Sequence, residues 1–471
     1  MSLTKWIVGL LLCLLIAAGF WTARGDRDDA AVVAALQRRR AGDAIEKSTA
    51  VTTVHRLTDQ VIADGKQISQ GWVVQVRDRA RPRIKLPARP TARGGFADDA
   101  PRSAGREREP GLGFVGADAC AECHRERHAG FRETGHYQTS AVCTADRVLG
   151  PLQPPGNQLQ TDDPSWSIRM QSEDGQVAQV VQLLDWRFPI PMDVIVGSGK
   201  LAQTFLFWQQ DALYESHVSY FTKTQMDGSG QWLASPGFEA VDANYARPIR
   251  VECLECHVTY IAKKEPPNRF HRESAIWGIS CERCHGPGQQ HVEFHQQTPS
   301  QTKAKFIVHP QDLSRQQQLD LCAQCHSGGF KFRQQPFRFR PGDDIDDFHK
   351  LYHPDSEDTG VHTSNQLTRL KQSECFKQSE MTCTTCHNPH QLQRGDLVAF
   401  SKACLKCHSA LQCKQKTLTP VELAADCISC HMPRTVNVDM QDMVTKGLEV
   451  SSIDHFIRVD RKSDLAPHAS R

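Results

Sequence analysis

The side chains best suited to chemistry recur in seven copies of one pattern, Cys-x-x-Cys-His. This spacing is typical of covalent haem c attachment, in which two thiols add to the two vinyl groups of one porphyrin. The adjacent histidine is then held over one face of the ring and binds the iron as its proximal axial ligand. In chain order, motifs 1 to 7 occupy residues 120–124, 253–257, 281–285, 322–326, 383–387, 404–408 and 427–431.

The motifs predict the cofactor, seven covalent haem c groups, and the residues that bind it. The cysteines expected to form thioether bonds are Cys120, Cys123, Cys253, Cys256, Cys281, Cys284, Cys322, Cys325, Cys383, Cys386, Cys404, Cys407, Cys427 and Cys430. The histidines expected to be proximal iron ligands are His124, His257, His285, His326, His387, His408 and His431.

Zinc and iron–sulfur binding are the alternatives to haem. A single copy of the pattern could be half of a zinc site or a redox-active cysteine pair. A zinc protein would group its cysteine pairs in fours, and it would not need a histidine after every pair. Seven complete copies therefore favour haem attachment.

Four cysteines lie outside the motifs: Cys13, Cys143, Cys375 and Cys413. Cys13 belongs to an apolar N-terminal run. Cys375 and Cys413 could form a disulfide, although spacing alone cannot fix the connectivity of cysteines.

The charge of the chain argues against a nucleic-acid partner. The polypeptide carries a formal net charge of +2. Each ferric haem with a neutral histidine adds roughly −1 from iron, porphyrin and propionates, so seven haems bring the total to about −5. The local arginine clusters therefore do not form the strongly basic surface that nucleic-acid binding requires.

A second axial ligand decides what each iron can do. An iron with two histidines is six-coordinate, low-spin and suited to electron transfer, whereas an open position can bind a substrate. We predict six distal ligands among the remaining histidines: His136, His271, His291, His362, His390 and His455. For each of them, a surface position or a hydrogen bond to a haem propionate is the alternative.

Local sequence bears on two of these predictions. His390 follows Pro389 directly after motif 5, so it is turned away from that haem and could serve a neighbouring one. His291 and His295 have helical i, i+4 spacing, so they could bind two irons, or one of them could bond a propionate.

Residues 1–25 predict export. Lys5 precedes an uncharged apolar run, which is the order of charge and hydrophobicity in a secretion signal. The length of the run lies between that of a signal peptide and that of a membrane span, so a cleaved signal and an uncleaved anchor both stay open. We favour the anchor, which would place the protein on the periplasmic side of the cytoplasmic membrane.

Around the motifs we expect a mainly α fold with much irregular structure, with a small antiparallel β insertion between haems 1 and 2. Apolar residues at helical spacing predict a helical stalk, and the insertion alternates apolar and polar residues between turn signals. The expected divisions are the signal or anchor (1–25), a helical stalk (26–76), a flexible linker (77–110), the first haem site (111–160), the β insertion (161–245), a six-haem core (246–440) and a tail with a possible axial ligand (441–471).

Several stretches resemble one family of multihaem c-type cytochromes. They are residues 114–124 with Gly135-His136, residues 281–288, residues 379–383, residues 430–433 and residues 454–458. The family includes the tetrahaem nitrification cytochrome and is related in haem packing to hydroxylamine oxidoreductase. The resemblance implies covalent haem c, mostly bis-histidine irons, and close haem pairs that form an electron wire.

The chain departs from the enzymes related to this family. No motif ends in lysine, as the active haem of pentahaem nitrite reductase does, and there are seven motifs rather than the eight of hydroxylamine oxidoreductase. We therefore expect an exported heptahaem cytochrome that relays electrons between redox partner proteins or from a quinol-linked donor. The alternative is a multihaem oxidoreductase with one open haem that acts on a small nitrogen or sulfur compound.

Overall fold

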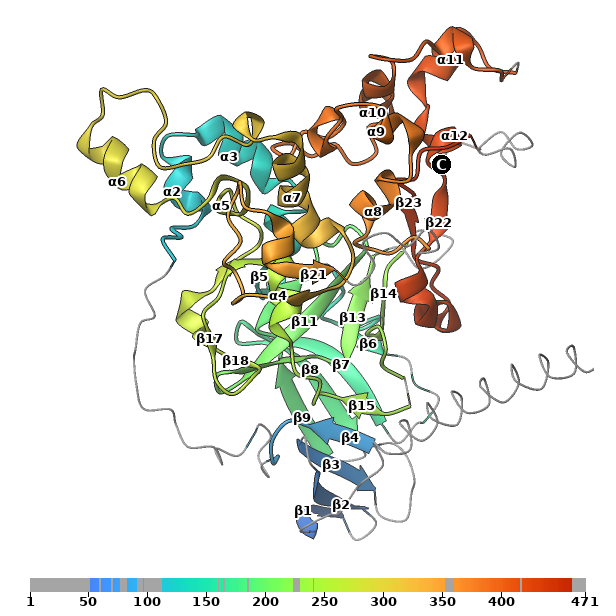
Figure 1. Cartoon of the computed structure of the whole chain (residues 1–471). Coiled ribbons are helices and arrows are strands. Elements are labelled where there is room, and N and C mark those ends of the chain that lie inside the picture. The colour runs from blue at the N-terminus through green and yellow to red at the C-terminus, as the bar shows by residue number, and fades with distance from the viewer. Residues whose placement is uncertain are drawn as a thin grey trace, which may run out of the picture.

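The fold is described from a computed structural model. The described residues are 51–58, 61–68, 71–76, 83–90, 96 and 112–459, with internal gaps at 160, 162, 164–165, 184–185, 223–228, 240, 352–359 and 416. Sheets form one half of the protein, and short helices that carry the motifs form the other (Figure 1).

A four-stranded antiparallel sheet forms from the alternating stretch after motif 1. Its order is β6 (Gln158–Leu159), β7 (Trp166–Glu173), β8 (Gln176–Leu183) and β9 (Trp186–Pro191). Along β7, Trp166, Ile168 and Met170 point into the core, as period-two alternation requires. Asp174 and Gly175 both have positive φ, which suits the tight turn that joins β7 to β8.

A second antiparallel sheet of eight strands packs beside the first. Its members are β5 (Ser140–Val142), β10 (Val194–Val196), β11 (Ala202–Gln209), β12 (Ala212–Glu215), β13 (Val218–Phe221), β14 (Gln231–Ala234), β17 (Lys263–Lys264) and β18 (Arg269–Phe270). Strands from before and after the predicted insertion therefore belong to this sheet.

A third sheet comes from the N-terminal part of the chain. It contains β1 (Val51–Thr58), β2 (Val61–Ile68), β3 (Gly71–Val76), β4 (Arg83–Leu86) and, paired in parallel with β4, β15 (Ala243–Asn244). The predicted helical stalk is wrong for residues 51–76, because three of these strands lie there. The rest of that segment lies outside the described residues.

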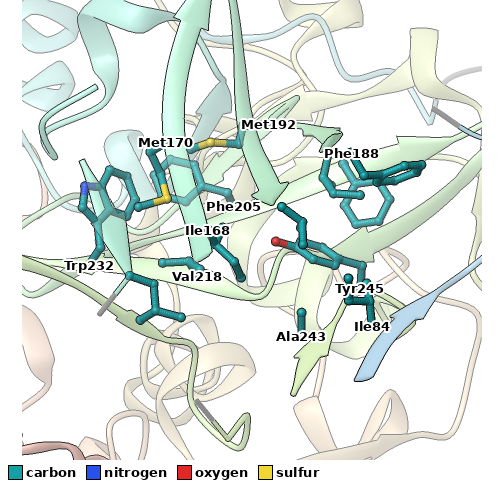
Figure 2. Close-up of a cluster of buried hydrophobic side chains, with 14 of the residues drawn as sticks. Ile84, Ile168, Met170, Phe188, Met192, Phe205, Val218, Trp232, Ala243 and Tyr245 are labelled. Carbon is teal, nitrogen blue, oxygen red and sulfur yellow. The ribbon is translucent and has the colours of Figure 1, made fainter. Parts of the chain in front are cut away.

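One hydrophobic core joins the three sheets. Figure 2 shows Ile84 of β4 and Phe188 of β9 near Tyr245, while Phe205 of β11 lies beside Met170 of β7 in the same core. Tyr245 is fully buried, and its hydroxyl donates a hydrogen bond to Gln179 Oε1 (3.1 Å). This aromatic core forms the base on which the motif-bearing half rests.

The motif-bearing half consists of short helices joined by loops. The α-helices are α2 (Ala117–Ala121), α3 (Arg125–Arg132), α4 (Val251–His257), α5 (Glu282–His285), α6 (Gln289–Gln297), α7 (Arg315–His326), α8 (Gln366–Leu370), α9 (Glu374–Lys377), α10 (Leu397–Cys404), α11 (Pro420–Ala425) and α12 (Ile428–His431). The 3-10 helices are η1 (Tyr137–Thr139), η2 (Ala145–Arg147), η3 (Arg272–Ser274), η4 (Pro310–Asp312), η5 (Ile345–Asp347), η6 (Cys383–Thr385), η7 (Ala410–Gln412) and η8 (Val438–Lys446).

Three strand pairs stiffen the loops of this half. They are β16 (Val258–Tyr260) with β19 (Ile276–Trp277), β20 (Phe330–Phe332) with β21 (His349–Leu351), and β22 (Arg434–Val436) with β23 (Ser451–Ile453).

The prediction of a mainly α fold with a small β insertion is wrong. Antiparallel strands are present in residues 161–245, but strands occupy more of the described chain than α-helices do. The motifs themselves keep the helices short, because each motif lies at or next to the C-terminal end of the helix that carries it. The β-rich stretch is meanwhile joined by strands from residues 51–86 and by β17 and β18, and it contributes most of the largest hydrophobic cluster among the described residues.

Membrane attachment was predicted from residues 1–25, which lie outside the described residues. Within the part of the chain that is described, none of the helices has both the length and the hydrophobicity needed to cross a bilayer.

Replacing Phe188 tests the aromatic core. Its side chain is 0% exposed and packs against Trp186 (ring centroids 5.2 Å apart) and Phe96 (5.4 Å). We expect Phe188→Ala to lower the free energy of unfolding by about 3–5 kcal/mol, because it leaves a cavity among rings. Urea denaturation followed by circular dichroism measures this change. Leu201→Ala, at a side chain that is 40% exposed, is the control, and equal midpoints for the two variants would refute the assignment of this core.

Candidate haem-binding sites

The backbone of the motifs places the first cysteine and the histidine on one face of a single helical turn. In five motifs the histidine N–H donates to the carbonyl oxygen of the first cysteine, four residues earlier. These bonds are His124 to Cys120 (2.9 Å), His285 to Cys281 (3.0 Å), His387 to Cys383 (2.9 Å), His408 to Cys404 (3.0 Å) and His431 to Cys427 (3.1 Å). Motifs 2 and 4 lie within α4 and at the end of α7.

Hydrogen bonds made by the Nδ1 atoms fix the tautomer of two motif histidines. His285 Nδ1 donates to the carbonyl oxygen of Val308 (2.8 Å), and His431 Nδ1 donates to that of Arg458 (3.0 Å). Since carbonyl oxygens only accept, each Nδ1 carries the proton and each Nε2 keeps its lone pair. This is the arrangement in which outer partners orient a metal-binding histidine.

Four motif histidines face a second histidine. Two imidazoles on opposite sides of one metal ion, with metal–nitrogen bonds of roughly 2 Å, have ring centroids about 6 Å apart. The observed pairs are His124–His291 (6.4 Å, 16° between planes), His285–His390 (6.0 Å, 25°), His326–His136 (6.0 Å, 72°) and His387–His455 (6.2 Å, 22°).

The second histidines come from segments distant in the sequence from the motifs they face. His136 precedes η1 and faces motif 4, whereas His390 follows motif 5 and faces motif 3. His291 Nδ1 donates to the carbonyl oxygen of Lys305 (2.8 Å), and His455 Nδ1 donates to that of Ile453 (3.1 Å). These two rings therefore also present an unprotonated Nε2.

Burial keeps the imidazoles of His136 and His455 neutral. Burial, with the nearby His326 and His387, lowers the pKa of His136 to about 4. Burial likewise lowers the pKa of His455 to about 4. Because a histidine must be neutral to bind a metal, both side chains are in the ligating form at neutral pH.

Two predicted distal ligands are placed differently. His271 Nδ1 lies 3.3 Å from Glu273 Oε1 near the surface. His362 Nδ1 accepts a hydrogen bond from the N–H of Ser364 (3.2 Å), and its Nε2 lies 3.4 Å from Asp439 Oδ2. His362 thus has the opposite tautomer to the paired histidines, and in the described chain neither ring faces a motif histidine.

The rings of His257, His408 and His431 do not face a second histidine among the described residues. His257 Nδ1 lies 3.0 Å from the hydroxyl of Thr139, and burial lowers its pKa. The described residues therefore offer no distal ligand for motifs 2, 6 and 7. His353 and His468 lie outside the described residues.

Motifs 1 to 5 lie in contact with one another. Thiols of different motifs are neighbours in three pairs: Cys120 with Cys281, Cys256 with Cys325, and Cys322 with Cys383. Motif 1 therefore adjoins motif 3, motif 2 adjoins motif 4, and motif 4 adjoins motif 5.

Motifs 6 and 7 continue this series. Burial and the nearby thiols of Cys427 and Cys386 together raise the pKa of Cys404 to about 11, so motif 6 lies near both motif 7 and motif 5. The hydroxyl of Ser401 on α10 accepts a hydrogen bond from the N–H of Cys427 (2.9 Å). In Figure 1 the series runs from α2 and α3 on one side, through α5 and α7, to α10 and α12 on the other.

The possible disulfide between Cys375 and Cys413 is not formed, and the described cysteines form no disulfides. Cys413 is exposed, whereas Cys375 lies close enough to Cys386 and Cys404 to raise their pKa values. Cys143 packs against the core of the sheets, where burial raises its pKa to about 12.

These residues fit haem c. Each motif offers two thiols and a histidine from one turn, and four motifs face a further histidine at the distance expected of a second axial ligand. A bound haem c supplies an iron that exchanges one electron, while the paired histidines would hold that iron six-coordinate.

Comparisons with known proteins agree with this chemistry. The family model described as "Cytochrome c554 and c-prime" matches residues 214–286, a span that includes motifs 2 and 3. The multiheme cytochrome MtrA of Shewanella baltica (strain OS185) is 26% identical over 188 residues, which are 36% of this chain and 55% of that protein. The matched region thus spans about half the length of that relative.

Two solved structures are similar in outline. The outer cell wall cytochrome OcwA has a TM-score of 0.46 and 15% identity, with coverage of 74% of this chain and 80% of that one. The undecaheme cytochrome from the S-layer of Carboxydothermus ferrireducens has a TM-score of 0.36 and 16% identity, with coverage of 74% and 52%. The motifs, the family model and the sequence relative identify this chain as a multihaem c-type cytochrome, a class of electron-transfer proteins.

Asp454 holds the segment that carries His455, and its replacement tests that role. Its carboxylate is 1% exposed and accepts hydrogen bonds from Arg369 (2.7 and 2.8 Å) and Arg458 (2.7 Å). We expect Asp454→Asn to destabilise this segment by about 3 kcal/mol, because it removes the buried charge that pairs with two partly buried arginines.

Hydrogen exchange of residues 451–458 measures this loss. Glu374→Gln, in an exposed ion pair with Lys377, is the control and should leave exchange unchanged. Wild-type protection of the segment in Asp454→Asn would show that the carboxylate does not hold it.

Proposed function

We propose that this protein is a heptahaem c-type cytochrome that relays electrons, and that at least four of its haems have two axial histidines. The observation that carries the proposal is the set of four opposed histidine pairs at motifs 1, 3, 4 and 5, each with centroids 6.0 to 6.4 Å apart. An iron with two imidazoles has no free position for a substrate, which favours electron transfer over catalysis.

The proposed ligand assignment follows the pairs. Each haem would be held by the two cysteines and the histidine of its own motif. The distal ligands would be His291 for motif 1, His390 for motif 3, His136 for motif 4 and His455 for motif 5. Because all four come from a different part of the chain than the motif they face, ligation would tie the loops of the motif-bearing half together.

The contiguous motifs support a relay through the protein. Neighbouring cysteines of different motifs, together with the Arg283–Glu255 ion pair between motifs 3 and 2, connect all seven sites, from α2 and α3 to α10 and α12 (Figure 1). The polypeptide contributes fixed spacing and an environment that tunes the potential of each iron. We infer that redox partner proteins, or a quinol-linked donor, exchange electrons at the ends of this series.

The N-terminal sequence supports export. We infer that residues 1–25 direct the protein out of the cytoplasm and retain it as an anchor on the periplasmic side of the cytoplasmic membrane. Fractionation of cells that express the full chain tests this inference. Recovery in the soluble periplasmic fraction would favour a cleaved signal, and recovery in the cytoplasm would exclude export.

The count of haems is tested by intact-protein mass. We expect material from a host competent in haem maturation to exceed the polypeptide mass by seven haems. The double variant Cys404→Ala and Cys407→Ala should carry six, because motif 6 then lacks both thiols. Cys143→Ala, outside the motifs, is the control and should keep seven. A wild-type count other than seven would contradict the proposal.

Helix α6 offers a matched pair of variants for ligation. His291 and His295 lie one turn apart, and both donate Nδ1–H to a loop carbonyl, but only His291 faces a motif histidine. We expect His291→Ala to convert one low-spin ferric haem to high-spin, measured by electron paramagnetic resonance, because motif 1 loses its second ligand. His295→Ala should leave the low-spin count unchanged.

The same measurement separates the two functions. Unchanged spectra in His291→Ala would refute the assignment of motif 1. A high-spin haem in the wild-type protein that shifts with nitrite, hydroxylamine or carbon monoxide would favour the alternative, a multihaem oxidoreductase with one open haem.

A further inference from the structure

The residues between the two cysteines of motifs 2, 3 and 4 are buried. These spacer residues lie on the side of the turn away from the cysteines, where side chains can point to solvent. Glu122 of motif 1 and Lys406 of motif 6 are exposed in this way. In contrast, the six spacer residues of the three central motifs are 0–5% exposed: Leu254, Glu255, Glu282, Arg283, Ala323 and Gln324.

Glu282 of motif 3 binds the segment that leads into motif 1. Its Oε1 accepts hydrogen bonds from the N–H groups of Val115 (2.8 Å) and Gly288 (2.9 Å), and its Oε2 accepts one from Gly116 (2.8 Å). The hydroxyl of Ser280 lies 3.4 Å from Oε2. Since α2 begins at Ala117 and carries Cys120, this carboxylate connects motif 3 directly to motif 1.

Glu255 of motif 2 and Arg283 of motif 3 form a buried ion pair. Arg283 Nη2 donates to Glu255 Oε1 (3.0 Å) and to the Glu255 carbonyl oxygen (2.9 Å). Glu255 Oε2 also accepts a hydrogen bond from the N–H of Phe337 (2.8 Å). Breaking one partner of such a pair is costly, so motifs 2 and 3 are held in one relative position.

Gln324 extends the network to motif 4. Its carbonyl oxygen accepts a hydrogen bond from the Cys256 thiol (3.8 Å), and its side-chain amide donates to the carbonyl oxygens of Leu321 (2.7 Å) and Arg283 (3.5 Å). The spacer residues thus link motifs 2, 3 and 4 to one another, and Glu282 adds motif 1.

We propose that Glu282 is a positioning residue that fixes motif 1 against motif 3 and sets the potentials of the haems that these motifs would carry. This inference rests on the proposed function. A buried carboxylate between these two motifs would favour the oxidised state of the haems that they hold, because reduction adds negative charge to the site. Its hydrogen bonds to Val115 and Gly116 fix the distance across which the two haems would interact.

Glu282→Gln tests the proposal, with Glu122→Gln as the matched control. Both change one glutamate between motif cysteines to its neutral isostere, but only Glu282 is buried. We expect Glu282→Gln to raise two of the haem potentials in spectroelectrochemical titration and to lower the melting temperature. Glu122→Gln should change neither. A lower melting temperature with unchanged potentials would show a purely structural role and overturn the proposal.

A second variant keeps the test decisive if Glu282→Gln does not yield holoprotein. Glu282→Asp retains the charge but is one methylene shorter, so the bonds to Val115 and Gly116 lengthen. We expect altered paramagnetic resonance signals from two low-spin haems, and wild-type signals would overturn the proposal. A wild-type haem count other than seven would instead contradict the proposed function, so the two failures are distinguishable.

Discussion

The constraint on which the rest of this structure depends is that one five-residue turn brings together two thiols and a histidine, which we propose are the covalent tether and an axial ligand of a haem. A single i→i+4 hydrogen bond places the first cysteine and the histidine on one face, so each site needs almost no regular structure around it. Seven such turns can then be packed side by side with loops between them. The helices of this half of the protein are short because each site needs only one helical turn.

The two halves of the protein are stabilised by different interactions. The three sheets bury aromatic side chains around Tyr245, and this core consists of protein atoms alone. The motif-bearing half instead holds its loops together with the buried ion pairs Arg283–Glu255 and Arg369–Asp454, and we propose that paired histidines on shared irons complete it. The β half thereby provides a fixed base for sites whose spacing matters.

The sequence was sufficient for the chemistry and insufficient for the fold. The motifs predicted haem because their spacing is chemically specific, and His136, His291, His390 and His455 were predicted as distal ligands and do face motif histidines. Which motif each one faces depends on tertiary packing, as the pairing of His390 with motif 3 shows. Periodicity also mistook residues 51–76 for helix, because the pairing of β1, β2 and β3 with one another and of β3 with β4 overrides local preference. Glu282 was missed, although charged residues between motif cysteines were a visible signal.

Anomalous diffraction at the iron edge from crystals of the holoprotein tests the central claim most directly. The account predicts seven iron peaks, of which four lie midway between the rings of His124 and His291, His285 and His390, His326 and His136, and His387 and His455. Histidine pairs in contact with no iron between them, or peaks at the zinc edge instead, would contradict it.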